Sequence, residues 1–531
     1  MAIRFGEDNR NTNSGGGGGG RNSGNNNDNR AGAAILLAIL LFVFKKPKIA
    51  IPLLLVGAVA FFIFAPEELQ QQILGDDTTT DSESIYSMGC SIDPEKYDDT
   101  EAFEALAASS SHYNIPSRAS LLKYAPSRRN QGQQGSCVGW ASAYAARTIL
   151  EAHTTGRNPD DIAFSPSFLY NQIALRGCNG SYTSEALEKM KRDGLLAFSK
   201  FPYNQNSCNA QPSSSQLSEA RNFRIRGYNR LTMTGGNYDV DIEAIKQNIA
   251  QGAPVVIAVK VPPSFNYVNG DRWKPDSHEA NNVRNYGGHA MCLIGYDENK
   301  NGGSFQIMNS WGRDWGNDGV TWVNYRDFQT FCREAYGLYP HPKAKTSSDS
   351  KFSIDFGLIT WDEGNTNQPI PVKRTRGNVF DVIKPLRKGE KFKIESVNNT
   401  ECYMYAFTLE ADGRTSTRIF PHDAKTSPYC GIVGPRHIPK AENQFFFADD
   451  SDVQERFTLV FSKKPLDYDA VSRRITNSRK SNYEDRVMDA LSDRLISNVK
   501  FKTRGNSQIG FEAAAKGSRD AVAVVMTIDK Y

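Results

Sequence analysis

A cysteine at the start of an Ala-rich segment is the first residue in this 531-residue chain whose setting could support chemistry. The stretch Asn130-Gln-Gly-Gln-Gln-Gly-Ser-Cys137-Val-Gly-Trp-Ala141 is a Gly-containing loop leading into a helix expected over 141–152. A helix N-terminus carries unpaired N–H groups and partial positive charge, which favour thiolate over thiol. Taken alone, such a cysteine is equally compatible with a small buried hydrophobic residue.

Two further polar residues follow at the ends of apolar segments. His289 opens a predicted strand behind Gly287 and Gly288, and Asn309 ends another before Ser-Trp-Gly. An imidazole can exchange a proton with a thiol, and an amide oxygen can accept the other ring N–H and orient the ring. Glycines beside the histidine would allow close approach of a second element. A lone histidine here would also suit a purely structural role.

Together these segments resemble the papain family of cysteine peptidases, in the family's order of Gln, Cys, His and Asn. The resemblance implies Cys137 as nucleophile, His289 as acid and base, and Asn309 as the orienting residue. It implies Gln131, six residues before the cysteine, as an oxyanion-hole donor together with the Cys137 backbone N–H. Trp311 would shield the His–Asn bond from water.

Further stretches extend the resemblance. Gly177-Cys-Asn-Gly180 is similar to the family segment that lines the substrate cleft, which implies that Gly180 and Ser181 bind substrate. Phe201-Pro-Tyr203 also fits. Two positions depart from plant and animal members, namely Val138 after the nucleophile and Gln134 in place of a bridging cysteine, and both are similar to bacterial members.

The cysteines near the cleft segment leave two alternatives. Because Gln134 removes the usual partner of Cys178, the resemblance to a second family bridge implies a Cys178–Cys208 disulfide. The alternative is two unpaired thiols. No inhibitory propeptide helix is evident before the domain, which leaves a zymogen form in doubt.

The resemblance implies an α+β, two-lobed papain-like fold over 119–344, with the nucleophile in a helical lobe and the histidine and asparagine in a β-barrel-like lobe. Strands are expected over 254–261, 289–296, 304–308 and 320–325 from their β-branched and aromatic residues between turn signals.

The segment 351–531 is expected to be a β-rich, sandwich-like accessory domain. Strands are predicted over 391–397, 403–409, 418–420, 457–461 and 521–528, and a helix over 482–498 with an apolar face of Val487, Ala490, Leu491 and Leu495. Its stretches Gly389-Glu-Lys-Phe392, Tyr403-Met-Tyr-Ala406, Arg418-Ile-Phe-Pro421 and Ile438-Pro439 resemble an uncharacterised domain found beside bacterial peptidases. That resemblance implies binding or assembly through a protein partner and no chemistry.

The N-terminal region has a different composition. Residues 1–30 are Gly- and Asn-rich and are expected to be disordered, and 66–118 form an acidic linker. Two apolar stretches of about 14 and about 17 residues within 31–65 are predicted to be a membrane anchor of one or two short helices. A buried hairpin and a cleaved signal peptide are the alternatives.

Charge orients the predicted anchor. Lys45, Lys46 and Lys48 precede the second apolar stretch and acidic residues follow it, so the positive-inside rule places the lysines in the cytoplasm. The localisation expected is therefore the membrane, with the catalytic domain outside the cytoplasm, in the periplasm or at the cell surface. Membrane lipid would be a partner through 31–65.

Composition excludes some functions. The net charge of +4 gives no basic face for nucleic acid, and eight cysteines are too few for a disulfide scaffold. The motifs need no cofactor and no metal. We therefore expect a membrane-anchored cysteine endopeptidase acting on peptide or protein substrates through a thioester. The alternatives are a transpeptidase or other acyltransferase on the same fold, an inactive peptide-binding homologue, and a purely structural membrane protein.

Overall fold

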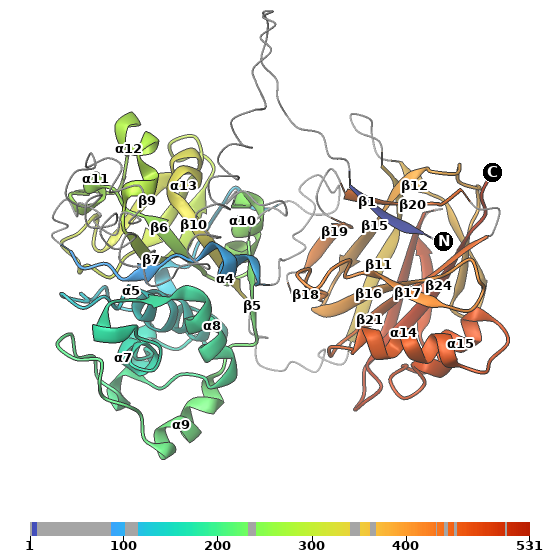
Figure 1. The fold of residues 1–531 in the computed structure, drawn as a ribbon, viewed down its shortest axis with the longest axis horizontal. Coiled ribbons are helices and arrows are strands. Elements are labelled where there is room, and N and C mark those ends of the chain that lie inside the picture. Colours follow the sequence, from blue (N-terminus) through green and yellow to red (C-terminus); the bar gives the residue numbers. More distant parts are fainter. Residues whose placement is uncertain are drawn as a thin grey trace, which may run out of the picture. The chain divides into compact units, whose positions relative to one another are not determined.

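The computed structural model of the chain describes residues 3–7, 86–100, 115–231, 240–339, 351–361, 368–431, 433–439, 444–450, 454–504 and 507–531. These residues form a mixed α/β part before position 340 and a β-rich part after position 350, as the α+β prediction requires (Figure 1). Each part is described by itself.

An antiparallel sheet dominates one lobe of the first part. Its order is β5 (Tyr228–Arg230), β10 (Cys332–Leu338), β6 (Val255–Lys260), β7 (Gly288–Asp297), β8 (Ser304–Met308) and β9 (Val320–Asn324), with β3 (Arg118–Ser120) also paired to β7. The four strands predicted in this region are confirmed within two residues at each end. They are rich in β-branched and aromatic residues, and β6 to β8 are buried almost throughout.

The lobe with the nucleophile is helical. A continuous helix runs through α5 (Cys137–Gly139), η2 (Trp140–Arg147) and α6 (Thr148–Thr155), and η2 has hydrogen bonds of the π type. Every residue of η2 is buried, because small alanines let neighbouring elements pack around the whole helix. Gly156 ends it with φ of +71°, a conformation that favours glycine, and its N–H bonds the Ala152 carbonyl.

Shorter helices complete the two lobes. The helical lobe also holds η1 (Leu122–Tyr124), η3 (Pro159–Ile162), α7 (Pro166–Tyr170), η4 (Arg176–Cys178), α8 (Thr183–Arg192), η5 (Phe198–Lys200), α9 (Ser214–Ala220) and η6 (Arg221–Phe223). The strand lobe holds α10 (Ile242–Ala250), α11 (Pro263–Asn266), α12 (Ser277–Asn281), η7 (Val283–Asn285) and α13 (Tyr325–Phe331). Figure 1 shows a blue segment, which ends in α4 (Pro94–Asp98), passing between the lobes.

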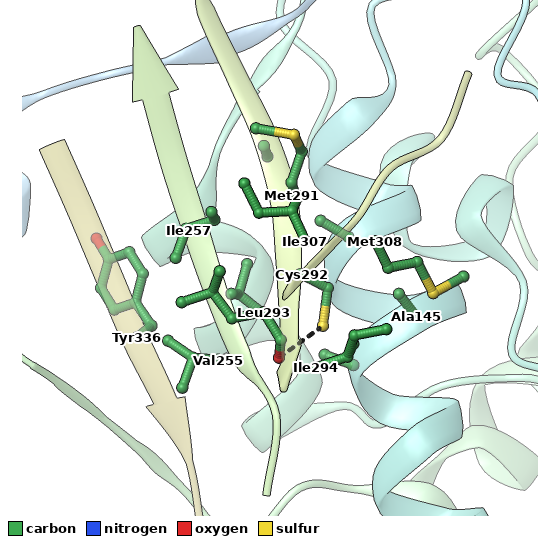
Figure 2. Close-up of a cluster of buried hydrophobic side chains, with 14 of the residues drawn as sticks. Ala145, Val255, Ile257, Met291, Cys292, Leu293, Ile294, Ile307, Met308 and Tyr336 are labelled. Carbon is green, nitrogen blue, oxygen red and sulfur yellow. Dashed lines mark hydrogen bonds between the residues drawn. The ribbon is translucent and has the colours of Figure 1, made fainter. Parts of the chain in front are cut away.

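A shared core joins helix and sheet in this part. Figure 2 shows Cys292 and Leu293 of β7 packed with Val255 and Ile257 of β6 and Ala145 of η2, all fully or almost fully buried. The Cys292 thiol therefore lies among apolar side chains, and burial raises its pKa far above the ordinary thiol value. A thiol in such surroundings is inert, unlike a cysteine at a cleft.

The β-rich part consists of two sheets packed face to face. One contains β1 (Arg4–Glu7), β20 (Gln444–Phe447), β15 (Lys391–Asn398), β11 (Lys351–Thr360), β23 (Gln508–Ala514) and β22 (Lys500–Arg504), with β12 (Pro369–Ile370) and β19 (Gly434–Ile438) attached. The other contains β13 (Val372–Arg376), β14 (Val379–Val382), β24 (Ala521–Ile528), β21 (Glu455–Ser462), β16 (Cys402–Leu409) and β17 (Ser416–Phe420), with β18 (Tyr429–Cys430) attached. Phe356 of β11 meets Phe461 of β21 with ring centroids 5.3 Å apart, which places the apolar core between the sheets. The predicted sandwich is confirmed.

The helix predicted over 482–498 is shorter in the structure. α15 (Tyr483–Ala490) stops at Leu491, and the chain then turns so that Leu495 bridges to Ala521 of β24. Leu495, whose spacing suited a helix, is therefore paired with a strand instead. A second helix, α14 (Tyr468–Asn477), was not predicted; both helices pack on the outer face of the sheet that contains β16 and β21 (Figure 1).

The N-terminal predictions need correction. None of the helices in the described residues is long and apolar enough to cross a membrane, which contradicts the transmembrane helix and the membrane localisation expected from hydropathy. The stretch 31–65 itself lies outside the described residues, as does most of the 1–30 tail. Within that tail, Arg4–Glu7 form β1, which pairs antiparallel with β20 rather than being disordered.

Candidate active site

Cys137 begins α5 and is completely buried. The backbone N–H of Ala290, next to His289 on β7, donates to its Sγ at 3.4 Å. Burial raises the pKa of the thiol to about 12, while hydrogen bonds from the backbone of Ala290, Val138 and Gly89 oppose this shift. The helix start and the strand thus both point N–H groups at one sulfur atom, and a segment from outside these two elements, at Gly89, adds a third.

His289 and Asn309 are joined as the sequence predicts. The distance between His289 Nε2 and Asn309 Oδ1 is 2.8 Å, and the Ser310 backbone N–H donates to the same oxygen at 2.7 Å. Because that oxygen can only accept, Nε2 carries the hydrogen and Nδ1 has the free lone pair. Trp311 stacks on the imidazole with centroids 4.5 Å apart and is itself buried, so water is kept from the bond.

The electrostatics of this pair differ from the thiolate–imidazolium pair that the helix start suggested. Burial lowers the pKa of His289 to about 4, against the opposing effect of its bond to Asn309, and the Cys137 pKa is about 12. Burial thus disfavours the charged form of each group in this structure. His289 Nδ1 is buried and finds no hydrogen-bond partner among the described residues, so the atom is free to accept a proton. Burial is the main cause of both pKa shifts, because it disfavours the thiolate and the imidazolium.

Gln131 is completely buried and its amide is fully engaged. Its Nε2 donates to the Ser87 carbonyl at 3.0 Å and to the Gln134 carbonyl at 2.9 Å, while its Oε1 accepts from the Ser310 hydroxyl at 2.6 Å. The Trp311 indole N–H donates to the same Ser87 oxygen at 3.2 Å. Two side-chain donors beside the triad therefore converge on one carbonyl oxygen, which belongs to a segment far from them in sequence.

We call that segment, residues 86–91, the strap. Tyr86 stacks on Trp311 with centroids 4.5 Å apart and an interplanar angle of 6°. Gly89 lies so close to Gly135 that an added Cβ would be 2.2 Å from the Gly135 carbonyl oxygen. The strap ends in β2 (Cys90–Ser91). Its residues contact Cys137, Trp311 and Gln131. Its contacts explain why Cys137 is wholly buried.

The predicted cleft residues Gly180 and Ser181 also contact the strap. The Ser181 N–H donates to the Gly89 carbonyl at 2.9 Å, and β4 (Ser181–Tyr182) pairs with β2 in parallel. A Cβ on Gly180 would stand 2.5 Å from the Gly89 oxygen, so only glycine leaves room for this backbone. The strap is thus an extended segment of this chain that lies against both Gly180 and Ser181.

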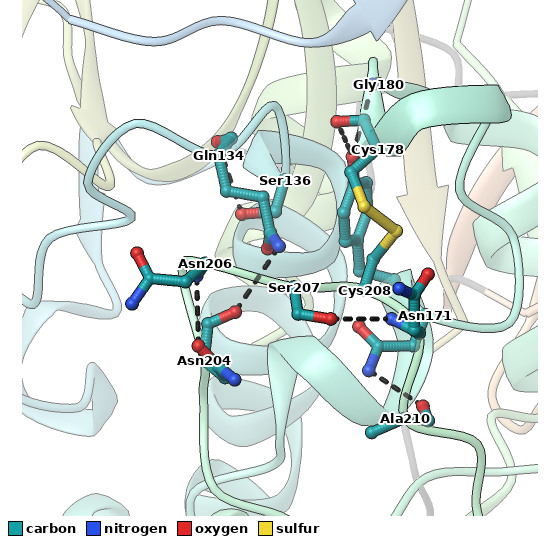
Figure 3. Close-up of a disulfide and its surroundings, with 12 residues drawn as sticks. Gln134, Ser136, Asn171, Cys178, Gly180, Asn204, Asn206, Ser207, Cys208 and Ala210 are labelled. Atoms are coloured by element: carbon teal, nitrogen blue, oxygen red, sulfur yellow. Dashed lines mark hydrogen bonds between the residues drawn. A yellow bond between two sulfur atoms is a disulfide. The ribbon is translucent and has the colours of Figure 1, made fainter.

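A disulfide joins Cys178 and Cys208, with Cα atoms 5.9 Å apart (Figure 3). It ties the loop before Gly180 to the segment after Phe201-Pro-Tyr203. Gln134 lies nearby and donates to the Asn204 carbonyl at 3.3 Å. This residue, which stands in place of a bridging cysteine, therefore makes a hydrogen bond instead of a disulfide. The bridge holds the cleft segment without a covalent tie to the loop that carries the nucleophile.

The strap was missed in sequence reasoning, which placed it within the acidic linker 66–118. Nothing in the local sequence marks it, since Ser87, Met88 and Gly89 form no motif and only two residues of it extend a sheet. Its role depends on contacts with residues 40 to more than 200 positions away, such as Gln131 and Trp311. The described residues contain no cluster of side chains able to hold a metal ion.

Comparison with known proteins identifies the part that carries this site. Residues 117–338 match the family model described as papain family cysteine protease. Cathepsin K of Mus musculus is 27% identical over 194 residues, covering 36% of this chain and 54% of that protein. A cysteine protease of Blomia tropicalis is 29% identical over 205 residues, covering 37% of this chain and 56% of that protein. The chain thus spans about half the length of these relatives.

Solved structures of cysteine proteases align with part of this chain. Xylellain, a cysteine protease from Xylella fastidiosa, aligns with a TM-score of 0.40 at 22% identity, covering 49% of this chain and 97% of that one. A cysteine protease of Carica candamarcensis aligns with a TM-score of 0.33 at 22% identity, covering 42% and 98%. The matched part is a papain-family peptidase domain, and its class is that of cysteine-type peptidases.

Proposed function

Given a papain-family cysteine protease domain at 117–338, we propose that this chain is a latent cysteine endopeptidase that hydrolyses peptide bonds through a thioester on Cys137. One observation carries the proposal: His289, bonded through Nε2 to Asn309, keeps Nδ1 unpartnered within the described site, and its neighbour Ala290 donates to the Cys137 sulfur. A base with one nitrogen fixed and the other free, next to a thiol, is the arrangement that nucleophilic catalysis needs.

In the proposed reaction Cys137 gives its proton to His289 Nδ1 and the thiolate attacks the scissile carbonyl carbon. The C–N bond breaks as the imidazolium returns that proton to the leaving amine, and an acyl thioester remains. His289 then takes a proton from water, whose oxygen attacks the thioester, and the carboxylic acid leaves as the thiol is restored. Asn309 holds the ring in place throughout.

The oxyanion of each tetrahedral state would be held by the Gln131 side chain and the Cys137 backbone N–H. Support comes from the Ser87 carbonyl, which already accepts from Gln131 Nε2. A strap oxygen therefore stands in for a substrate carbonyl oxygen at this donor. Donors fixed in a buried site stabilise developing charge more than donors in water.

Latency follows from the strap. Its backbone bonds Gln131 and Ser181, and the burial of the closed site raises the pKa of Cys137 and lowers the pKa of His289. A substrate needs the same donors, so the strap has to leave before a peptide binds. Opening also lets water reach the pair, which favours the charged forms that burial suppresses.

The β-rich part has a separate proposed use. Its two packed sheets and two covering helices supply an apolar core and no part of the candidate active site. We assign it to binding a protein partner or to assembly, as expected of an accessory domain.

Labelling tests the proposed chemistry. An epoxysuccinyl peptide should alkylate Cys137 alone, slowly in the full chain because the strap is closed for most of the time, and Cys137→Ala should abolish both this labelling and the residual peptide cleavage. Cys292→Ala is the matched control, because it removes a buried thiol outside the site and should leave labelling unchanged. Cleavage that persists in Cys137→Ala contradicts the proposal, and products joined to an added amine instead of water would indicate acyl transfer.

A further inference from the structure

Two cysteines of the β-rich part face each other across a pair of strands. Cys402 begins β16 and Cys430 ends β18, and the two residues are partners in the antiparallel register. Directly opposite residues on antiparallel strands point to the same face of the sheet and have Cα atoms about 4.5 or 5.5 Å apart. A disulfide needs Cα atoms about 4.4–6.8 Å apart, so either form of pairing brings the two cysteines within range.

The two thiols also contact each other. A hydrogen bond with Cys430 is the largest contribution to the raised pKa of Cys402, and burial is the next. Cys402 is 2% exposed and Cys430 is 3% exposed, and both belong to the apolar core between the sheets. The two sulfur atoms are therefore neighbours in a core that keeps solvent and small reagents away from them.

Other buried cysteines of the strands lack this arrangement. Cys292 lies opposite Val256 and Met308, and Cys332 lies opposite Val259. A buried cysteine that only fills apolar space has no need of a second thiol beside it. The position of Cys402 against Cys430 thus calls for an explanation that burial alone does not give.

The pair lies where the chain passes from one sheet of the sandwich to the other. β18 ends at Cys430 in the sheet that contains β16, and β19, which begins at Gly434, pairs with β15 in the other sheet (Figure 1). The Cys430 carbonyl accepts a hydrogen bond from the Asn398 side chain of β15 at 2.9 Å. Because β18 has only two residues, a covalent bond to Cys402 would hold this crossing more firmly than strand pairing does.

We propose that Cys402 and Cys430 form a second disulfide of this chain in the presence of a disulfide oxidant such as oxidised glutathione, and that the bridge fixes the crossing between the two sheets. The inference goes beyond the proposed peptidase function and does not depend on it. The Cys178–Cys208 bridge supports it, because disulfides form and persist under oxidising conditions, which act on any pair of thiols at the right spacing.

The oxidation balances with one molecule of oxidant. The Cys430 thiolate attacks one sulfur atom of oxidised glutathione, and a glutathione thiolate leaves as a mixed disulfide forms. The Cys402 thiolate then attacks the Cys430 sulfur, the protein S–S bond forms and the second glutathione thiolate leaves. The protons of both cysteines go to the two leaving thiolates, and the oxidant takes up two electrons. Burial makes both sulfur atoms slow to react once the core has formed, so the exchange belongs to folding.

The test follows the pair while the chain folds. The full chain is synthesised in a cell-free system at increasing ratios of oxidised to reduced glutathione, and the soluble protein is collected. It is unfolded without reductant, its remaining thiols are alkylated, and the digested peptides are mapped by mass spectrometry. The Cys178–Cys208 bridge reports in the same sample that the oxidant has acted, and Cys292 and Cys332 report mispairing, because neither lies opposite a thiol.

We expect a cross-linked peptide that joins Cys402 to Cys430. The number of alkylated thiols should fall from the six outside the Cys178–Cys208 bridge to four, the two lost being Cys402 and Cys430. In Cys402→Ala, Cys430 should be alkylated or carry glutathione at every ratio, whereas the matched control Cys292→Ala should keep the cross-link. Alkylation of both Cys402 and Cys430 at every ratio overturns the inference, as does a main product that joins either of them to another cysteine.

Hydrogen exchange tests the effect of the bridge on the fold. The backbone amides of β18 and β19 should exchange at least several-fold more slowly in the bridged chain than in a chain synthesised with reduced glutathione alone, because a cross-link suppresses local opening. Equal exchange in the two forms overturns the assigned role at the crossing between the sheets.

Discussion

Gly89→Ala should activate the full chain by unseating the strap. The added Cβ would lie 2.2 Å from the Gly135 carbonyl oxygen and 2.5 Å from two further backbone atoms of Gly135. Backbone atoms cannot move aside as a flexible side chain can, so the strap itself must shift. Overpacking of this kind costs about 1–3 kcal/mol. Loss of the bond from the Ser181 N–H to the Gly89 carbonyl adds about 1 kcal/mol.

The combined destabilisation of the closed form is about 2–4 kcal/mol, since the two effects act on the same segment. At 1.4 kcal/mol per factor of ten, the open fraction rises about 30- to 700-fold until opening is complete. We therefore expect kcat/KM for a fluorogenic peptide to increase at least about tenfold. Alkylation of Cys137 by iodoacetamide at pH 7 should accelerate in parallel, because the pKa of a thiol freed from burial falls.

Ser91→Ala is the matched control, since it alters the same strap without adding an atom, and it should behave like the wild-type chain. Thermal unfolding of both variants checks that the peptidase domain remains folded. A folded Gly89→Ala variant whose kcat/KM and alkylation rate equal those of the wild-type chain would show that the strap does not block the site.

Three further outcomes are expected. Gln131→Ala should lower kcat by about 10²–10³ with little change in KM, because one oxyanion donor is lost; steady-state kinetics in a Gly89→Ala background measures this, and a change confined to KM contradicts it. Removing the Cys178–Cys208 bridge by double alanine substitution should reduce the free energy of unfolding by about 3–4 kcal/mol, as for a closed loop of 30 residues, measured by urea denaturation; alkylation of both thiols in the unreduced native chain would show that no bridge exists. Burial raises the pKa of Glu334 on β10 from 4.5 to about 7, while the Asp93 backbone N–H, Tyr336 and Thr183 oppose this shift and the Asp93 charge adds a smaller increase. Opening of the strap that admits water to this carboxyl should lower its pKa. Closure should therefore weaken as pH rises through 7, so alkylation of Cys137 should accelerate more steeply between pH 5 and 8 in the wild-type chain than in Glu334→Gln.

The order and local setting of the reactive residues can be read from the sequence. Cys137 follows a glycine loop at a helix start, and Asn309 follows a short strand of mainly apolar residues, so both positions depend on local signals in the sequence. The strands β7, β8 and β24 were predicted within one residue for the same reason. The resemblance to one family then supplied the pairing of His289 with Asn309.

Tertiary structure decided what local signals cannot express. The strap has no pattern of its own, and only its contacts with Gln131, Trp311 and Ser181 show that it covers the site. The same burial raises the Cys137 pKa, in the direction opposite to the one that the helix start suggested, because desolvation disfavours the thiolate. Glu334 looks like any strand residue until the fold places it beneath Cys90, since a pKa and a missing partner depend on the surroundings of a residue and not on its neighbours in sequence.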